Sequence, residues 1–140
     1  MNVDEFVRQL RTRTPARGGI EILAPQSPQG LAEVERRLGT RLPPGVRRFY
    51  EALDGFEVSS PRLHVFRAQS LSKDPDGRIA FAEFAGRHRL VFLANQLNPA
   101  QEWSIANAET GFVVTLTMAS FWSNKVFAWL DRQRPVWGPE

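Results

Sequence analysis

The first 55 residues of this 140-residue chain carry three segments with the apolar spacing of amphipathic helices. In such a helix, apolar side chains recur about every three or four residues and form one stripe that faces a core. The spacing predicts helices over residues 3–13, 28–38 and 44–53. Their stripes consist of Val3, Phe6, Val7 and Leu10; of Leu31, Val34 and Leu38; and of Val46, Phe49, Tyr50 and Leu53. Any fold of this chain must therefore bury three helical stripes.

Residues with strong preferences for helix ends mark where these segments begin and stop. Ser27 followed by Pro28 predicts a helix start, because a hydroxyl caps the first turn and proline suits its first position. Pro44 opens the third helix in the same way. Gly39 and Gly55 are placed as stops, since glycine adopts the left-handed conformation without a Cβ penalty.

Residues 14–26 have no helical period, and we expect them to form a connector that Ile20, Ile22 and Leu23 anchor to the core. After residue 55 the sequence changes to short runs rich in β-forming residues and bounded by turn residues. These runs predict strands over residues 56–58, 63–66, 90–94, 102–106 and 112–116, with an antiparallel meander from residue 90 onward.

Two further segments are assigned as helices. Residues 79–85 fit a short helix or a strand, and the flanking Asp74-Pro75 and Gly86 favour the helix. A last helix is expected over residues 120–134, with Pro135 as its stop. Its inner face would carry Trp122, Val126, Trp129 and Leu130.

The order of helices, strands and a final helix predicts an α+β fold with N-terminal helices, a central antiparallel sheet and a C-terminal helix. A doubly wound parallel sheet is excluded because strands and helices do not alternate along the chain. A length of 140 residues supports one core, so residues 1–140 are expected to form a single domain.

Composition removes several functional classes. The chain has no cysteine, which excludes disulfides, thiolate metal sites and a cysteine nucleophile. No apolar run approaches the ~20 residues that span a bilayer. Asp4 and Glu5 stand where a signal or transit peptide avoids acids, so we expect a cytoplasmic protein without membrane contact.

No arrangement of residues in the sequence indicates catalysis. His64 and His88 are the only histidines, and nothing in the sequence connects either of them to a nucleophile. The carboxylates are dispersed, without the pairing that general acid–base chemistry or metal binding requires. Phosphate-binding glycine motifs are missing as well. We therefore expect no enzyme activity, no catalytic residue, no metal site and no cofactor.

Residues 31–58, LAEVERRLGTRLPPGVRRFYEALDGFEV, resemble the SUKH superfamily, the fold of the yeast cell-wall-regulator type. The family pattern is an amphipathic helix ending in Leu-Gly, a Leu-Pro element, a helix with paired aromatics, and Asn-Gly or Asp-Gly. The matching structural positions here are Gly39, Leu42, Pro43, Pro44, Phe49, Tyr50, Asp54 and Gly55. The later strands and the last helix follow in the family's order, so the resemblance covers about residues 27–134. Helix 3–13 and connector 14–26 would be a family-variable extension.

The resemblance implies an interaction protein. Bacterial members of the superfamily are mostly immunity proteins of polymorphic toxin systems, which bind a cognate toxin domain and block it without catalysis. For the contact surface we expect the loops that flank the sheet, because loops on a rigid scaffold commonly carry function. The candidate partner-binding residues are Phe56, Glu57, Asn95, Gln96, Glu102 and Trp103. The sequence leaves the oligomeric state open.

Charge suggests an alternative function. The net charge is +3, and residues 1–48 hold nine arginines against five acids, an excess of four. An arginine-rich surface on these helices would suit a regulatory adaptor or a nucleic-acid-binding module. An inhibitor of a basic nuclease should instead be acidic where it binds. For a chain of this composition, either the toxin is not a typical basic nuclease, or the acids gather on one face, or the immunity assignment is wrong.

Overall fold

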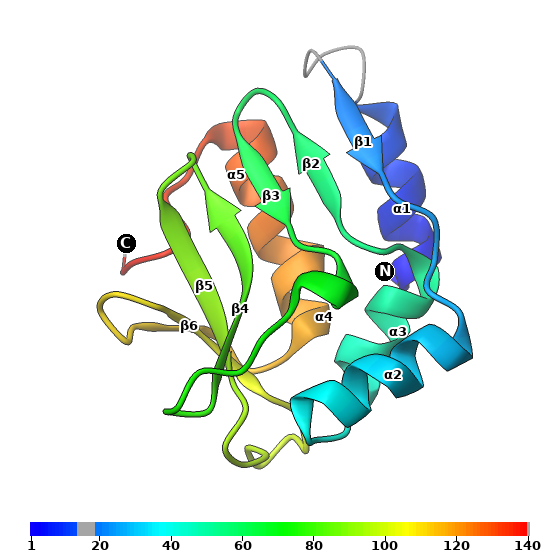
Figure 1. Cartoon of the computed structure of the whole chain (residues 1–140). Coiled ribbons are helices and arrows are strands. Elements are labelled where there is room, and N and C mark those ends of the chain that lie inside the picture. The colour runs from blue at the N-terminus through cyan, green and yellow to red at the C-terminus, as the bar shows by residue number, and fades with distance from the viewer. Residues whose placement is uncertain (14–18, 140) are drawn as a thin grey trace.

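An antiparallel sheet forms the centre of the computed structural model, which describes residues 1–13 and 19–139 (Figure 1). In this part of the chain seven strands follow one another from edge to edge in chain order, with each strand antiparallel to the next. The strands are β1 Ile20–Ile22, β2 Phe56–Val58, β3 Leu63–Val65, β4 Arg78–Phe84, β5 His88–Leu93, β6 Ser104–Asn107 and β7 Val113–Thr115. The predicted α+β, single-domain architecture is therefore confirmed.

Helices precede the sheet and return after it. They are α1 Val3–Thr12, α2 Pro28–Leu38, α3 Pro44–Ala52, α4 Met118–Ser120 and α5 Val126–Arg132, with a 3₁₀ turn at Ala68–Ser70 and a π-helical turn at Phe121–Lys125. In Figure 1, α4 and α5 lie behind the sheet, and α1, α2 and α3 lie together beside β1 and β2.

The N-terminal helices begin and end within one residue of the predicted bounds, but α3 stops at the extended Leu53 and not at the predicted stop, Gly55. Asn2 caps α1, since its Oδ1 accepts the N–H of Glu5 at 2.9 Å. Ser27 Oγ accepts the N–H of Gly30 at 3.0 Å, and Gly39 ends α2 in the left-handed conformation with φ 72°. Each helix therefore satisfies backbone groups that its own hydrogen bonds leave unpaired.

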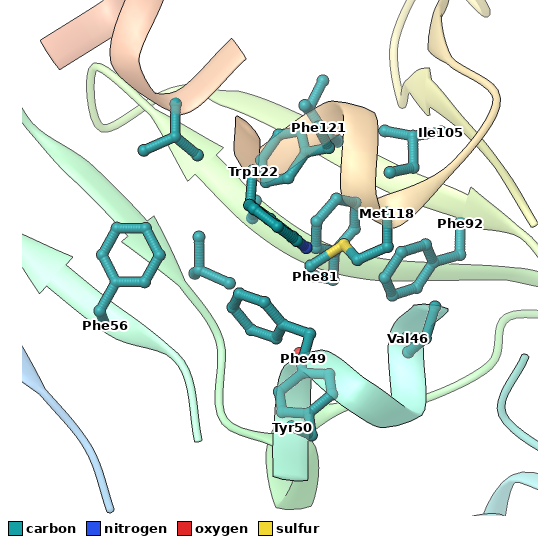
Figure 2. Close-up of a cluster of buried hydrophobic side chains, with 14 of the residues drawn as sticks. Val46, Phe49, Tyr50, Phe56, Phe81, Phe92, Ile105, Met118, Phe121 and Trp122 are labelled. Atoms are coloured by element: carbon teal, nitrogen blue, oxygen red, sulfur yellow. The ribbon is translucent and has the colours of Figure 1, made fainter. Parts of the chain in front are cut away.

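The core lies between the helices and one face of the sheet. In Figure 2 the side chains of Phe49, Phe81, Met118 and Trp122 converge from α3, β4, α4 and the π-helical turn. The Phe81 and Phe92 rings stack with centroids 4.0 Å apart. Burial of each such side chain stabilises the fold by about 1.5–3 kcal/mol before entropy is counted. Aromatic packing of distant segments thus holds the helices on the sheet.

The helix expected over residues 79–85 is wrong, because this segment is the strand β4. A β-bulge between Ala80 and Ala82 shifts the register against β5, and Phe81 and Ala82 are both fully buried. The bulge interrupts the two-residue alternation by which a strand is recognised, so the pattern resembles a helix. Gly86 belongs to the turn between β4 and β5 rather than to a helix end.

Two other boundaries differ from the expectation. The connector predicted over residues 14–26 contains the edge strand β1, in which Ile20 and Ile22 pack against the core, while residues 14–18 lie outside the described residues. The last helix ends at Arg132, because Gln133 takes a left-handed conformation and donates its N–H to the carbonyl of Trp129 at 2.8 Å. Its predicted inner residues, Trp122, Val126, Trp129 and Leu130, are all buried.

Candidate protein-binding face

One face of the sheet packs on the core, and the other, here called the open face, meets solvent. On β2 and β3, the residues on either side of Glu57 and His64 are buried. The side chains of Glu57 and His64 are themselves 57% and 41% exposed. Because side chains alternate along a strand, these two residues point away from the core. The open face is therefore the part of the sheet that a partner can reach.

Strand register arranges ionisable side chains of the open face in one row. Residues that lie directly opposite each other on neighbouring strands are Glu21 of β1 and Glu57 of β2, Glu57 and His64 of β3, His64 and Glu83 of β4, and Glu83 and Arg89 of β5. We call this the charged row. Its members come from sequence positions up to 68 residues apart, so only the sheet brings them together.

Charge balance changes along the charged row. Glu83 and Arg89 form an ion pair at 3.1 Å, which neutralises the row at β4 and β5. At the other end, Glu21 and Glu57 are adjacent, exposed carboxylates, and no ion pair of Glu21 occurs among the described residues. Like charges directly opposite each other destabilise a sheet. The row is therefore acidic at β1 and β2, where a cation from outside would relieve repulsion.

A hollow of about 280 Å³ lies at this acidic end, which we call the acidic notch. Its lining consists of Glu21, Leu23, Glu57, His64, Arg67 and Ser70. His64 Nδ1 lies 3.4 Å from Glu57 Oε1, and its ring meets the edge of Phe66 at 4.8 Å. Arg67 directs its Nε to Asp54 Oδ2 at 3.0 Å rather than to the two glutamates. The notch thus presents two carboxylates, one imidazole and a half-exposed guanidinium whose charge is balanced by the buried Asp54.

The buried carboxylate of Asp54 fixes the segments around the notch. Asp54 is 1% exposed, and its Oδ1 accepts the N–H of Ala68 at 2.9 Å. Its Oδ2 accepts hydrogen bonds from Gln26 Nε2 and Arg67 Nε, each at 3.0 Å. Asp54 therefore ties the loops after β1 and β3 to the end of α3.

Other positions of the Leu-Pro and Asp-Gly pattern have structural roles too. The Tyr50 hydroxyl donates to the carbonyl of Phe66 at 2.8 Å, and burial together with the nearby Asp54 charge raises the pKa of that hydroxyl. Gly55 has φ 81°, and a Cβ there would meet the carbonyl oxygen of Val65 at 2.4 Å. Gly55 is therefore required both for its conformation and for close approach to β3.

Three of the six residues predicted to contact a partner belong to the interior. Phe56 and Trp103 are 0% and 2% exposed, and Glu102 is 9% exposed. The expectation that these three side chains are exposed on loops flanking the sheet is wrong. Phe56 occupies a core-facing strand position, and Trp103 packs against Phe92 with ring centroids 5.5 Å apart. Both Glu102 oxygens accept the N–H of Gly45, at 3.2 and 3.1 Å, so Glu102 caps α3 in place of Pro43.

The remaining predicted contact residues are exposed but separate. Glu57 lies in the acidic notch. Asn95 and Gln96 lie in the loop after β5, beside another hollow of about 520 Å³. Asn95 Nδ2 donates to the carbonyl of Asp76 at 2.7 Å, which joins this loop to the turn before β4. The structure therefore brings Glu57 together with Glu21, His64 and Arg67 rather than with the predicted loop residues.

Sequence reasoning missed Glu21, Glu83 and the role of His64. The pattern Ile-Glu-Ile at residues 20–22 is a strand alternation that would have indicated an outward Glu21, but it is only three residues long. Glu83 was hidden by the helical interpretation of its segment. For His64, the missing information was its register opposite Glu57 and Glu83, which no local pattern contains.

The arginines of the first 48 residues are divided among several structural contacts. Arg13 forms a two-bond ion pair with Asp131, with both nitrogen–oxygen distances 2.8 Å. Arg37 donates to carbonyls of the 3₁₀ segment, and Arg47 pairs with Glu35 at 2.7 Å. Arg36 pairs with Glu33, and Arg17 lies outside the described residues. The exposed remainder, Arg8, Arg11, Arg41 and Arg48, is distributed over α1, α3 and the segment before α3.

Residues 1–13 and 19–139 offer no metal site or membrane-spanning helix. This part of the chain contains no group of three or more histidine, aspartate and glutamate side chains placed to hold a metal ion. None of its helices combines the length and apolar character needed to cross a bilayer. His88 stacks on Trp137 with ring centroids 4.1 Å apart, away from the charged row.

Neither a model of a known protein family nor a curated protein matches this chain.

Proposed function

We propose that this protein binds a basic partner protein stoichiometrically through the open face, and that it is an immunity protein of SUKH type acting on a toxin domain. This proposal is carried by the adjacent Glu21 and Glu57 of the acidic notch, for which the described residues supply no lysine or arginine ion pair. The two carboxylates lie opposite each other on neighbouring strands of a net basic chain, and they repel each other. A lysine or arginine of a partner would remove this repulsion.

The proposed mechanism is occlusion. The sheet is a rigid platform, because its inner face packs on the core and hydrogen bonds to Asp54 hold the loops after β1 and β3. A toxin that acts on nucleic acid needs a basic surface around its active site. The open face would cover that surface, with the notch receiving one cationic side chain, and inhibition would require no turnover. The cytoplasm, where such a toxin acts, is the proposed location.

The SUKH resemblance supports the immunity assignment, and the open face supports the sign of the partner's charge. A net charge of +3 is unexpected for a protein that binds a basic partner. The conflict is reduced because the acidic residues of the sheet lie on one face, while much of the basic charge lies on helices. The nucleic-acid alternative receives less support, because several N-terminal arginines are held in ion pairs and hydrogen bonds within the fold.

Where a toxin domain is encoded beside the gene of this protein, co-expression of the two tests the proposal. The wild-type chain should restore growth, and the double variant E21K/E57K should lose rescue and at least about tenfold in affinity for the purified toxin domain. The matched control is E33K/E51K, which makes the same change of charge on exposed glutamates of α2 and α3.

Three outcomes would overturn parts of the proposal. A toxin that stays lethal beside the wild-type chain excludes the immunity assignment for that toxin. Equal rescue by both double variants excludes the open face as the binding surface. Tight binding of duplex DNA by the wild-type chain, with log K falling steeply against log salt, would favour the arginine-rich module instead.

A further inference from the structure

The two edges of the sheet differ in charge and in exposed apolar surface. Strand β1 forms one edge and carries the exposed Glu21. Strand β7 forms the other, and residues 112–124, which include it, contain no charged side chain. Edge strands expose backbone hydrogen-bonding groups, and proteins commonly protect them with charges or proline. The edge at β7 has neither charge nor proline, and its protection is limited to its length of three residues and to the register shift against β6.

Exposed apolar side chains gather beside the same edge. Among the described residues, the large hydrophobic side chains with high exposure are Met1, Leu97, Val113 and Leu116. Val113 lies on β7, and Leu116 follows it directly, with exposures of 45% and 56%. Leu97 belongs to a loop that is held there, because Asn98 Nδ2 donates to the carbonyl of Leu116 at 2.8 Å. Three of these four side chains therefore lie on two segments that are joined at the β7 edge, a grouping that favours an interaction surface.

We propose that β7 of this protein pairs with β7 of a second copy, antiparallel and around a two-fold axis, so that the two sheets become continuous. Two copies of the same strand that pair antiparallel are related by a two-fold axis. This is the symmetry of most dimers, in which each copy offers the same surface to the other. An uncharged strand opposes only uncharged residues in this arrangement. At the β1 edge, self-pairing would bring the Glu21 carboxylates of two copies together, which disfavours that contact.

The proposed dimer is compatible with partner binding but does not depend on it. Strand β7 has three residues, so the pair has few backbone hydrogen bonds and is reversible. Because its contacts are apolar and backbone contacts, raising the salt concentration should not weaken it. Association of the basic helices of one copy with the acidic notch of another would be weakened by salt, so salt separates the two modes.

Sedimentation of the purified full chain over a range of concentrations tests the dimer. The wild-type mass should rise from 15.9 kDa toward twice that value, equally at low and high salt. Val113→Lys should remain at the monomer mass at every concentration, because it places like charges beside each other across the axis. The matched control Ala32→Lys, on the exposed surface of α2, should associate like the wild type.

A second measurement locates the contact. The chain has no cysteine, so Val113→Cys carries a single pyrene label. Excimer emission that grows with concentration is expected from a label at β7, and none from the same label at Glu21→Cys on the other edge. A wild-type chain that is monomeric at its highest soluble concentration overturns the proposal. So does a dimer that high salt dissociates, or one that Val113→Lys retains with unchanged thermal stability.

Discussion

His88 at the start of β5 lies parallel to Trp137 in the C-terminal segment, with ring centroids 4.1 Å apart and an interplanar angle of 9°. Trp137 also meets Trp129 edge-on at 5.3 Å, and its carbonyl accepts a hydrogen bond from Asn107 Nδ2 at 2.7 Å. One of the contacts that dock the C-terminal segment on the sheet is thus made by a residue that can change its charge.

Acid should weaken this docking. Desolvation, and then the charge of Arg87, lower the pKa of His88, while Glu109 acts in the opposite direction. Because the pKa of His88 is lower in the folded state, the native protein binds fewer protons than the unfolded chain. The contribution of His88 to the free energy of unfolding is therefore complete above the unfolded-state pKa of about 6.5. It is lost as the pH falls through the folded-state pKa. NMR titration should show His88 titrating below about 6.5. In Trp137→Ala the pKa should move up toward that value, and an unchanged pKa would contradict the role of Trp137.

Loss of the Asp54 carboxylate should destabilise the fold. Asp54→Ala removes the acceptor of the buried Ala68 N–H and two side-chain hydrogen bonds. We expect a loss of about 2–3 kcal/mol in denaturant-induced unfolding, since a buried donor without a partner costs about 1–3 kcal/mol by itself. Asp76→Ala, at a carboxylate whose side chain is 78% exposed, is the control and should change stability little. Equal stability of both variants would contradict the anchoring role.

Glu102 should prove structural rather than partner-binding. Glu102→Ala removes the cap of α3 at Gly45, which should lower the free energy of unfolding by about 1 kcal/mol. Thermal melts measure the effect. Full stability of Glu102→Ala together with lost toxin affinity would return this residue to the contact surface.

Neutralising one carboxylate of the notch should make the free protein more stable. Glu21→Gln removes repulsion with Glu57, so its melting temperature should exceed that of the wild type at low salt. The gain should shrink as salt screens the exposed charges. Partner affinity should fall in the same variant, as expected where binding surfaces are kept at a cost in stability. A lower melting temperature would show that Glu21 has a stabilising contact.

Part of the candidate site could be predicted from local patterns, and part could not. Glu57 was selected as a residue of the loops that flank the sheet, and it is exposed because it lies between the core-facing Phe56 and Val58 of β2. Trp103 and Glu102 were predicted to be exposed, but both are buried. The sequence around them does not show that Trp103 packs on β5 or that Glu102 accepts a hydrogen bond from α3. The charged row was missed because it depends on register between strands.

By itself, the sequence determined the three N-terminal helices and the α+β order. These follow from apolar periodicity and from Ser27, Gly39 and Pro44, whose end preferences act within a few residues. Tertiary structure alone decided that residues 78–84 form a strand and that Glu21 and Glu57 oppose each other. A bulge and a strand register are set by partners far along the chain, so their energies are not contained in any local segment.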